Sequence, residues 1–306
     1  MGKCVLLMAA FMAALALAGT ADAGTFPGRN GRIAFTANVG PRSEVFTMRA
    51  NGHDRRQLTN EAAGAADPNW TADGKQLVYA RSDGLASLIG AGGGPPAIVT
   101  AQEPISDPSI SPDGKRLAFT VNGDGLFDGP SIYVMNLDGS GLQRLASGSG
   151  PQWSPDGNWI AYVSVPADTG CSDVRLMQPD GSTNHPVAEG QPDAAGICHG
   201  GGDVPSFSPD SKRVLFVAHG IKTPHSQNGT DLYTVSIHGG TRKRLTRDDL
   251  VEGSPVFSPS GKLIVFAATG GRGRQNGTFI ISAAGKHRRR IAPPLAGLSW
   301  QPLPAG

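Results

Sequence analysis

The feature that most constrains the fold is a short motif that occurs five times along the chain. Its fullest copy, at residues 153–162, reads Trp-Ser-Pro-Asp-Gly-Asn-Trp-Ile-Ala-Tyr. Ser-Pro-Asp-Gly favours a tight turn, because Pro fixes φ, Asp bonds its own backbone and Gly accepts a positive φ. The flanking residues alternate between apolar and polar, as in half-buried strands. The other copies begin at Trp70, Ile110, Phe207 and Phe257. Five copies with the same internal spacing predict a repeat protein built of β-hairpins.

A second hairpin follows each copy and completes a four-stranded unit. An apolar strand such as residues 131–135 ends at a turn such as Asp138-Gly139, and a polar or basic strand comes next. Four short strands in two hairpins are typical of a β-propeller blade. The second strand of each unit carries an aromatic residue, and these recur at intervals of 40 to 54 residues. Blade repeats span about 40–50 residues, so we predict six blades, with insertions in the two longest intervals. The six aromatics are Phe35, Tyr79, Phe119, Tyr162, Phe216 and Phe266.

The two ends of the repeat region complement each other. Residues 29–35 read as a second strand without a first, and residues 298–302 read as a first strand without a second. We therefore predict an all-β, six-bladed propeller that closes when the N- and C-terminal strands pair in one blade, which removes the open edges. One large apolar residue per first strand should pack between neighbouring blades. These are Trp70, Ile110, Trp153, Phe207, Phe257 and Trp300.

The first residues have the pattern of a signal peptide. Lys3 precedes an apolar run at residues 5–18, and Ala21-Asp22-Ala23 matches a cleavage site. The run is short for a membrane span. We therefore expect residues 1–23 to be removed, a propeller domain over residues 24–306, and a periplasmic or secreted protein with no membrane insertion after cleavage. In an oxidising compartment the two remaining cysteines, Cys171 and Cys198, are expected to form a disulfide.

Charge narrows the classes of partner. Only 17% of residues are charged and the formal net charge is +2, which argues against nucleic acid or an anionic membrane as the partner. Three outer strands are basic, at residues 55–56, 242–244 and 288–290. They could form a patch for nucleic acid or acidic glycan. We expect instead that they lie on separate blades, make no continuous surface, and protect edge strands from aggregation.

The repeated Trp-Ser-Pro-Asp-Gly turn and the Ile-Ala-Tyr second strand resemble the TolB-type six-bladed propeller, built of WD40-like (PD40) repeats. The resemblance covers residues 30–302 and is specific for fold but not for function. The periplasmic TolB protein of the Tol–Pal system has an α/β domain before its propeller, and some peptidases have an α/β-hydrolase domain after theirs. Few residues lie between Gly24 and the first strand, and the sequence ends where the ring closes, so we expect neither domain here.

Candidate site residues lie on the face opposite the Ser-Pro-Asp-Gly turns, where every insertion falls. Asp67, Asp107 and Asp203 recur just before the first strands, at the expected mouth of the central channel. Carboxylates there suit a hard cation such as calcium, but we favour the interpretation that each Asp caps a local turn. His199 and His219 belong to the same face.

With His225 these histidines suggest a transition-metal site, but they lack the tight spacing of a helix-borne ligand pair. No Gly-x-Ser-x-Gly elbow and no phosphate-binding loop are present.

The sequence therefore favours a non-catalytic, monomeric scaffold that binds a protein, peptide or glycan of the cell envelope through the loops and channel. We expect no required cofactor, with calcium as the one candidate. The alternative is a metal-assisted polysaccharide lyase or hydrolase that uses the histidines and carboxylates. A purely structural envelope protein is a third hypothesis, because the fold does not fix the function.

Overall fold

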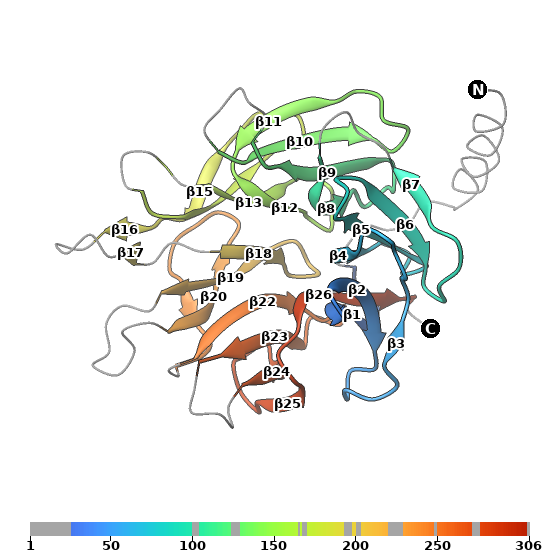
Figure 1. The fold of residues 1–306 in the computed structure, drawn as a ribbon. Helices are drawn as coiled ribbons and strands as arrows, with labels where there is room; N and C mark the ends of the chain where they lie inside the picture. Colours follow the sequence, from blue (N-terminus) through green and yellow to red (C-terminus); the bar gives the residue numbers. More distant parts are fainter. Residues whose placement is uncertain are drawn as a thin grey trace.

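A computed structural model describes residues 26–99, 104–123, 129–164, 166, 170–192, 198–199, 203–219, 229–247, 250–270 and 276–304. Within these ranges the chain forms strands and connecting turns and contains no helix that could span a membrane. The strands fan around a central axis (Figure 1). The predicted signal peptide, residues 1–23, lies outside the described residues.

Short strands follow one another along the whole described chain. They are β1 (Arg29–Val39), β2 (Arg42–Met48), β3 (Arg56–Gln57), β4 (Ala65–Trp70), β5 (Gln76–Arg81), β6 (Ala86–Gly90), β7 (Ala97–Val99), β8 (Ser106–Ile110), β9 (Arg116–Val121), β10 (Ser131–Asn136), β11 (Gln143–Ser147), β12 (Ser149–Trp153), β13 (Ile160–Ser164), β14 (Asp173–Met177), β15 (His185–Ala188), β16 (Gln191–Pro192), β17 (Cys198–His199), β18 (Asp203–Phe207), β19 (Arg213–His219), β20 (Thr230–Ser236), β21 (Lys243–Arg244), β22 (Val251–Phe257), β23 (Leu263–Thr269), β24 (Gly277–Ser282), β25 (Arg289–Ala292) and β26 (Ala296–Leu303).

Six antiparallel four-stranded sheets form the blades of a propeller, as predicted. Blade 1 has the order β26-β1-β2-β3, and blades 2 to 6 are β4–β7, β8–β11, β12–β15, β18–β21 and β22–β25. A small hairpin, β16–β17, lies between blades 4 and 5 in the chain. The ring closes in blade 1, where Arg29 pairs with Leu303 and Ile33 pairs with Trp300. The expected pairing of the N- and C-terminal strands is confirmed.

In the repeated turns that contain an Asp, a buried Ser or Thr hydroxyl forms hydrogen bonds that involve the Asp of the motif. Ser111 is 1% exposed, donates to Asp113 Oδ1 at 2.5 Å and accepts from the backbone N–H of Arg116 at 2.9 Å. Asp113 also accepts from the N–H of Lys115 at 3.1 Å. A buried hydroxyl without partners is costly, so the Ser and the Asp two residues later act as one unit. The same bonds recur around Thr71, Ser154 and Ser208.

The hydrophobic core is divided into clusters at the junctions between blades. One large first-strand residue sits in each cluster and contacts the preceding blade of the ring. Trp70, for example, packs with Val45 of blade 1, and Trp153 packs with Ile132 of blade 3. All six of the predicted first-strand residues are at most 4% exposed. The expectation that they pack between blades is confirmed, and each blade therefore depends on its neighbours for burial.

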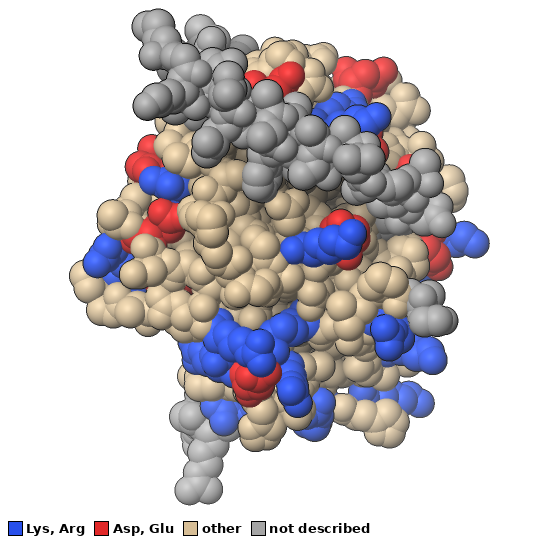
Figure 2. Space-filling model, turned by 90° about the vertical axis from the view of Figure 1, so that its right-hand side faces the viewer, with Lys and Arg blue, Asp and Glu red and all other residues tan. Residues whose placement is uncertain are grey.

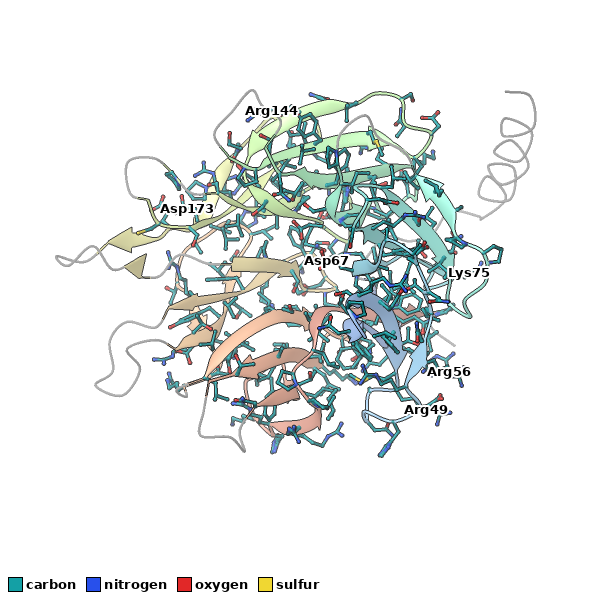
Figure 3. The ribbon with its side chains drawn as sticks, viewed as in Figure 1. Arg49, Arg56, Asp67, Lys75, Arg144 and Asp173 are labelled. Atoms are coloured by element: carbon teal, nitrogen blue, oxygen red, sulfur yellow. The ribbon has the colours of Figure 1, made fainter. Side chains whose placement is uncertain are left out.

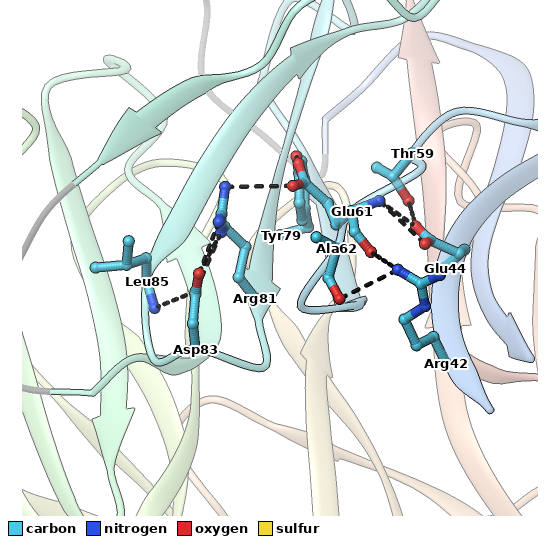
Figure 4. A network of polar contacts seen from close by, with 9 residues as sticks. All are labelled: Arg42, Glu44, Thr59, Glu61, Ala62, Tyr79, Arg81, Asp83 and Leu85. Carbon is cyan, nitrogen blue, oxygen red and sulfur yellow. Dashed lines mark hydrogen bonds and ion pairs between the residues drawn. The ribbon is translucent and has the colours of Figure 1, made fainter.

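Polar networks also join neighbouring blades, and the sequence did not reveal them. Glu44, in β2 and 2% exposed, accepts from the Thr59 hydroxyl at 2.5 Å and from the N–H of Glu61 at 3.0 Å. Glu61 in turn accepts from the Tyr79 hydroxyl at 2.5 Å and pairs with Arg81 at 3.3 Å (Figure 4). The loop between blades 1 and 2 is thereby tied to both of them.

The propeller has two unlike faces. We name the side of the Ser-Pro-Asp-Gly turns and outer hairpin turns the turn face, and the opposite side the loop face. Lys75, Arg49 and Arg56 lie toward one side of the molecule and Asp173 lies toward the other (Figure 3). Lys75 follows a repeated turn, whereas Asp173 begins β14 after an insertion. These labelled positions agree with the predicted sorting of turns and insertions; much of the inserted sequence lies outside the described residues.

Candidate functional site

A central cavity of about 440 Å³ lies between the first strands of all six blades. Its wall is mixed: large apolar side chains alternate with carboxylates, amides and hydroxyls. Asp67 lies near the middle of the ring in Figure 3. The polar residues of the wall are Asp67, Asn69, Asp107, Ser109, Ser149, Gln152, Ser206, Ser254 and Ser299.

A β-bulge repeated in the first strands sets the shape of this wall. The register of β4 against β5 shifts between Ala66 and Asn69, and the bulge residue Asp67 has a φ of 51°. Asp107 occupies the same place in blade 3, with a φ of 47°. Asp and Gly tolerate left-handed backbone better than most residues. The remaining bulge residues with positive φ are Gly150, Ser254 and Gly297.

Proline follows most of these bulges, for a reason that the sequence pattern did not reveal. A first strand has a partner on one side only, so it can accommodate a residue without an N–H. Pro68 and Pro108, for example, come directly after Asp67 and Asp107. The bulge is held from the previous blade: the Asp67 N–H donates to Thr36 Oγ1 at 3.1 Å, which is a contact between blades 1 and 2.

The environment of the two carboxylates in the bulges, Asp67 and Asp107, disfavours their ionised form. Burial, with the nearby charge of Asp107 as a second cause, raises the pKa of Asp67 to about 6. Burial also raises the pKa of Asp107, although hydrogen bonds from Thr120 and the Gly150 N–H oppose the effect. Among the described residues no Lys, Arg or His forms an ion pair with either carboxylate. The channel therefore presents negative charge that the described part of the protein does not neutralise.

Two amides define the wall beside these carboxylates. Asn69 Nδ2 of blade 2 donates to Gln152 Oε1 of blade 4 at 3.0 Å. The bond skips blade 3, so it joins parts of the ring that are not neighbours. Phe26, which is 8% exposed, lines the cavity from the segment that precedes β1. The N–H of Gly28 donates to the carbonyl of Pro259 at 3.2 Å, which places this segment on the turn face.

The predicted site residues are placed unequally. Asp67 and Asp107 line the cavity. Asp203 begins β18 and pairs with Val217, one position before the bulge. It is therefore in register with Ala66 rather than with Asp67, and its side chain lies outside the described residues. The joint binding role of these three carboxylates stays a prediction.

The histidine site stays a prediction for a different reason. His199 ends β17 and His219 ends β19, but neither side chain is among those described, and His225 lies wholly outside the described residues. In the part of the chain that is described, no three His, Cys, Asp or Glu residues gather as a metal site would require.

The cysteine pairing is only half visible. Cys171 is fully buried and engaged in a disulfide. The side chain of Cys198, in β17, is outside the described set, so its identity as the partner stays a prediction.

The channel residues that sequence reasoning missed are Asn69 and Gln152. A signal existed: each follows the Pro of the first strand and precedes the large apolar residue by one position, so all such residues share one side of the strand. Chemically, the channel offers two carboxylates and two amides in a wall that also carries large apolar side chains. It can receive a cationic group, such as a Lys or Arg side chain, an amine or a hard metal ion.

Comparison with known proteins places this channel in context. No family model matches the chain. It is 29% identical over 216 residues to the uncharacterized peptidase YuxL of Bacillus subtilis, covering 66% of this chain and 29% of that protein. It is 28% identical over 248 residues to the Tol-Pal system protein TolB of Francisella tularensis, covering 78% of this chain and 53% of TolB. The chain thus spans about half the length of the curated TolB relatives it matches.

Solved structures share the fold. TolB from Acinetobacter baumannii superposes with a TM-score of 0.71 and 22% identity, over 89% of this chain and 67% of that one. A putative TolB from Agrobacterium tumefaciens superposes with a TM-score of 0.68 and 21% identity, over 87% of this chain and 91% of that one. An oligogalacturonate lyase from Vibrio parahaemolyticus superposes with a TM-score of 0.59 and 11% identity, over 89% of this chain and 78% of that one. The chain therefore contains a TolB-like six-bladed β-propeller, as the sequence resemblance predicted.

Proposed function

We propose that the protein is an exported, non-catalytic scaffold that binds a protein partner of the cell envelope through its loop face and central channel. The observation that carries the proposal is the pair of carboxylates, Asp67 and Asp107, at the cavity wall without a cationic partner among the described residues. A partner segment with a Lys, an Arg or a free amine would supply the missing charge. The amides of Asn69 and Gln152 would then bond its backbone.

The comparisons support a protein rather than a glycan as the partner. The TolB relatives are named as members of the Tol-Pal system, an assembly of proteins, and the match covers 78% of this chain. On this similarity we propose a periplasmic location, with a Pal-type protein of the same organism as the first partner to test.

Site-specific photo-crosslinking tests the proposal in the envelope. A crosslinking amino acid at Ser149, which lines the cavity, should capture one envelope protein that mass spectrometry can identify. The same amino acid at Lys75, on the turn face, serves as the matched control. The Asp67→Asn/Asp107→Asn variant should lose the Ser149 product. A product of equal yield from Ser149 and Lys75, or one that the double variant retains, contradicts binding in the channel.

The second candidate is a metal-assisted lyase, which the fold similarity to oligogalacturonate lyase favours over other enzymes. It predicts that His199, His219 and His225 bind one transition metal together. Elemental analysis of the purified protein, combined with an assay of polygalacturonate cleavage, tests it directly. A stoichiometric metal lost in the His219→Ala variant, together with cleavage activity, would replace the scaffold proposal.

A calcium ion between Asp67 and Asp107 is a variant of the scaffold proposal. Melting temperature with calcium and with chelator distinguishes it, because an ion that binds only the folded state raises the melting temperature. Calcium would then compete with the crosslinked partner for the same carboxylates.

A further inference from the structure

A cluster of arginines on the turn face is not used by the proposed channel function. Arg32, Arg49, Arg55 and Arg56 of blade 1 gather with Arg289 of blade 6, and we name these five residues the basic patch. Figure 2 views the turn face and shows basic side chains gathered around an acidic one. The sequence-based expectation that basic outer strands make no continuous surface is therefore wrong for blades 1 and 6.

Backbone packing across the closing seam brings these arginines together. Gly52, in the outer turn of blade 1, has a φ of 86°, and a Cβ built there would overlap the carbonyl oxygen of Ile291. Only glycine allows that approach. The contact sets the blade 1 turn directly against β25, and Arg289 donates to the carbonyl of Ala50 at 3.4 Å.

Among the residues that the structure describes, most of the positive charge in the patch has no counter-charge. Asp54 Oδ2 lies 2.8 Å from Arg32, 3.3 Å from Arg49 and 3.0 Å from Arg56, so three guanidinium groups share one carboxylate. Hydrogen bonds from Arg32 and Arg56 hold the pKa of Asp54 at about 2, which keeps it ionised. The side chains of Arg49 and Arg56 are 66% and 61% exposed. Although the formal net charge of the whole chain is only +2, positive charge is therefore locally in excess at the basic patch.

The chemistry of the patch fits phosphate better than a nucleic-acid base. Guanidinium groups bond phosphate oxygens in pairs. Single-stranded nucleic acid also needs aromatic rings on which bases stack. Arg55 covers the available ring, because its guanidinium carbon lies 4.8 Å from the centre of Phe46. No groove is needed for a flat anionic surface, and the patch lies on a rim of the turn face.

The path of the chain indicates which anionic surface this is. The N-terminal segment reaches the propeller on the turn face, where Gly28 bonds Pro259. The apolar run at residues 5–18 precedes Phe26 by only a few residues. If that run is a signal peptide that occupies the bilayer during export, as the sequence predicts, the turn face and the basic patch would be held close to the same membrane.

We propose that the basic patch is an electrostatic contact for a membrane surface that carries anionic phospholipid. It would hold the turn face toward the bilayer and leave the loop face and channel open on the opposite side. The proposal does not depend on the channel function, because the two sites share no residue.

Vesicle co-sedimentation tests the contact. The apolar leader would bind membranes by itself, so the protein beginning at Gly24 is used, which contains all six blades. Vesicles of phosphatidylcholine alone are compared with vesicles in which about one third of the lipid is phosphatidylglycerol. We expect binding only to the latter and loss of binding in about 1 M salt, where charges are screened beyond roughly 3 Å.

A pair of double variants localises the contact. Arg49→Gln/Arg289→Gln removes two patch charges, and Arg42→Gln/Arg290→Gln removes two exposed charges that bond loop carbonyls elsewhere. Each basic residue near an anionic membrane contributes on the order of 1 kcal/mol, so the patch variant should bind ten-fold or more weakly. Circular dichroism checks that both variants are folded.

Three results would overturn the proposal. They are equal binding of the wild type to neutral and anionic vesicles, equal losses in the two double variants, and binding to soluble polygalacturonate or DNA without binding to vesicles.

Discussion

Replacing Asp67 by Asn should stabilise the protein at neutral pH. In the folded state the pKa of Asp67 is raised from 3.8 to about 6, first by burial and then by Asp107. Between these values the folded state binds more protons than the unfolded state, so stability falls as the pH rises through the window from about 4 to 6. A difference of about two units, at 1.36 kcal/mol each, corresponds to roughly 3 kcal/mol. Asn keeps the shape and tolerates the bulge backbone, and it never ionises.

Denaturant unfolding followed by tryptophan fluorescence measures this effect. At about pH 7.5 the Asp67→Asn variant should gain up to roughly 3 kcal/mol over the wild type, and near pH 4 the gain should vanish. Asp107→Asn is the matched control and should gain less, because Thr120 and the Gly150 N–H already stabilise that carboxylate. A gain that is the same at both pH values, or a loss at pH 7.5, would refute the electrostatic account. The stability gained would come at the cost of partner binding.

Three further substitutions test how the blades are joined, each by denaturant unfolding. Trp300→Ala removes a side chain that is 2% exposed in the closing strand and should cost about 3–5 kcal/mol; a loss below about 1 kcal/mol would show that closure does not depend on it. Tyr79→Phe removes the 2.5 Å hydrogen bond to Glu61 and should lower the free energy of unfolding by about 1.5–3 kcal/mol. No change would mean that this hydrogen bond does not stabilise the loop between blades 1 and 2. Gly52→Ala overlaps a neighbouring carbonyl, while Gly40→Ala has a similar positive φ and open space. Gly40→Ala should lower the free energy of unfolding by about 1–2 kcal/mol, and Gly52→Ala should lower it by several times as much. Equal losses would contradict close packing between blades 1 and 6.

The fold could be predicted from the sequence because its determinants are local and repeated. The Ser-Pro-Asp-Gly turn fixes each hairpin through the bonds of one buried hydroxyl, as at Ser111. The alternation of apolar and polar residues then decides which side chains face the preceding blade, as for Trp153. Ring closure could also be predicted locally. The N-terminal end of the repeat region has a blade without its first strand, and the C-terminal end has a first strand without the rest of its blade.

The site was less predictable because its geometry depends on contacts between distant blades. Asp67 and Asp107 could be named, but the offset of Asp203 by one residue depends on the register of β18. The bond between Asn69 and Gln152 skips a whole blade, which no local pattern records. The net charge of the chain likewise did not predict the basic patch, to which Arg289 is added only because the first and last blades are neighbours.

The split blade also fixes the order in which the molecule can be completed. The inner edge of β1 pairs only with β26, so the first strand to be synthesised waits for the last. Until then its backbone N–H and carbonyl groups are open to any passing strand. If the chain is exported N-terminus first, as we propose, the unpaired edge of β1 would emerge first and its partner strand β26 last. A circular permutant that begins in the loop before β4 would make blade 1 contiguous. It would test whether envelope chaperones are needed chiefly to guard that one edge.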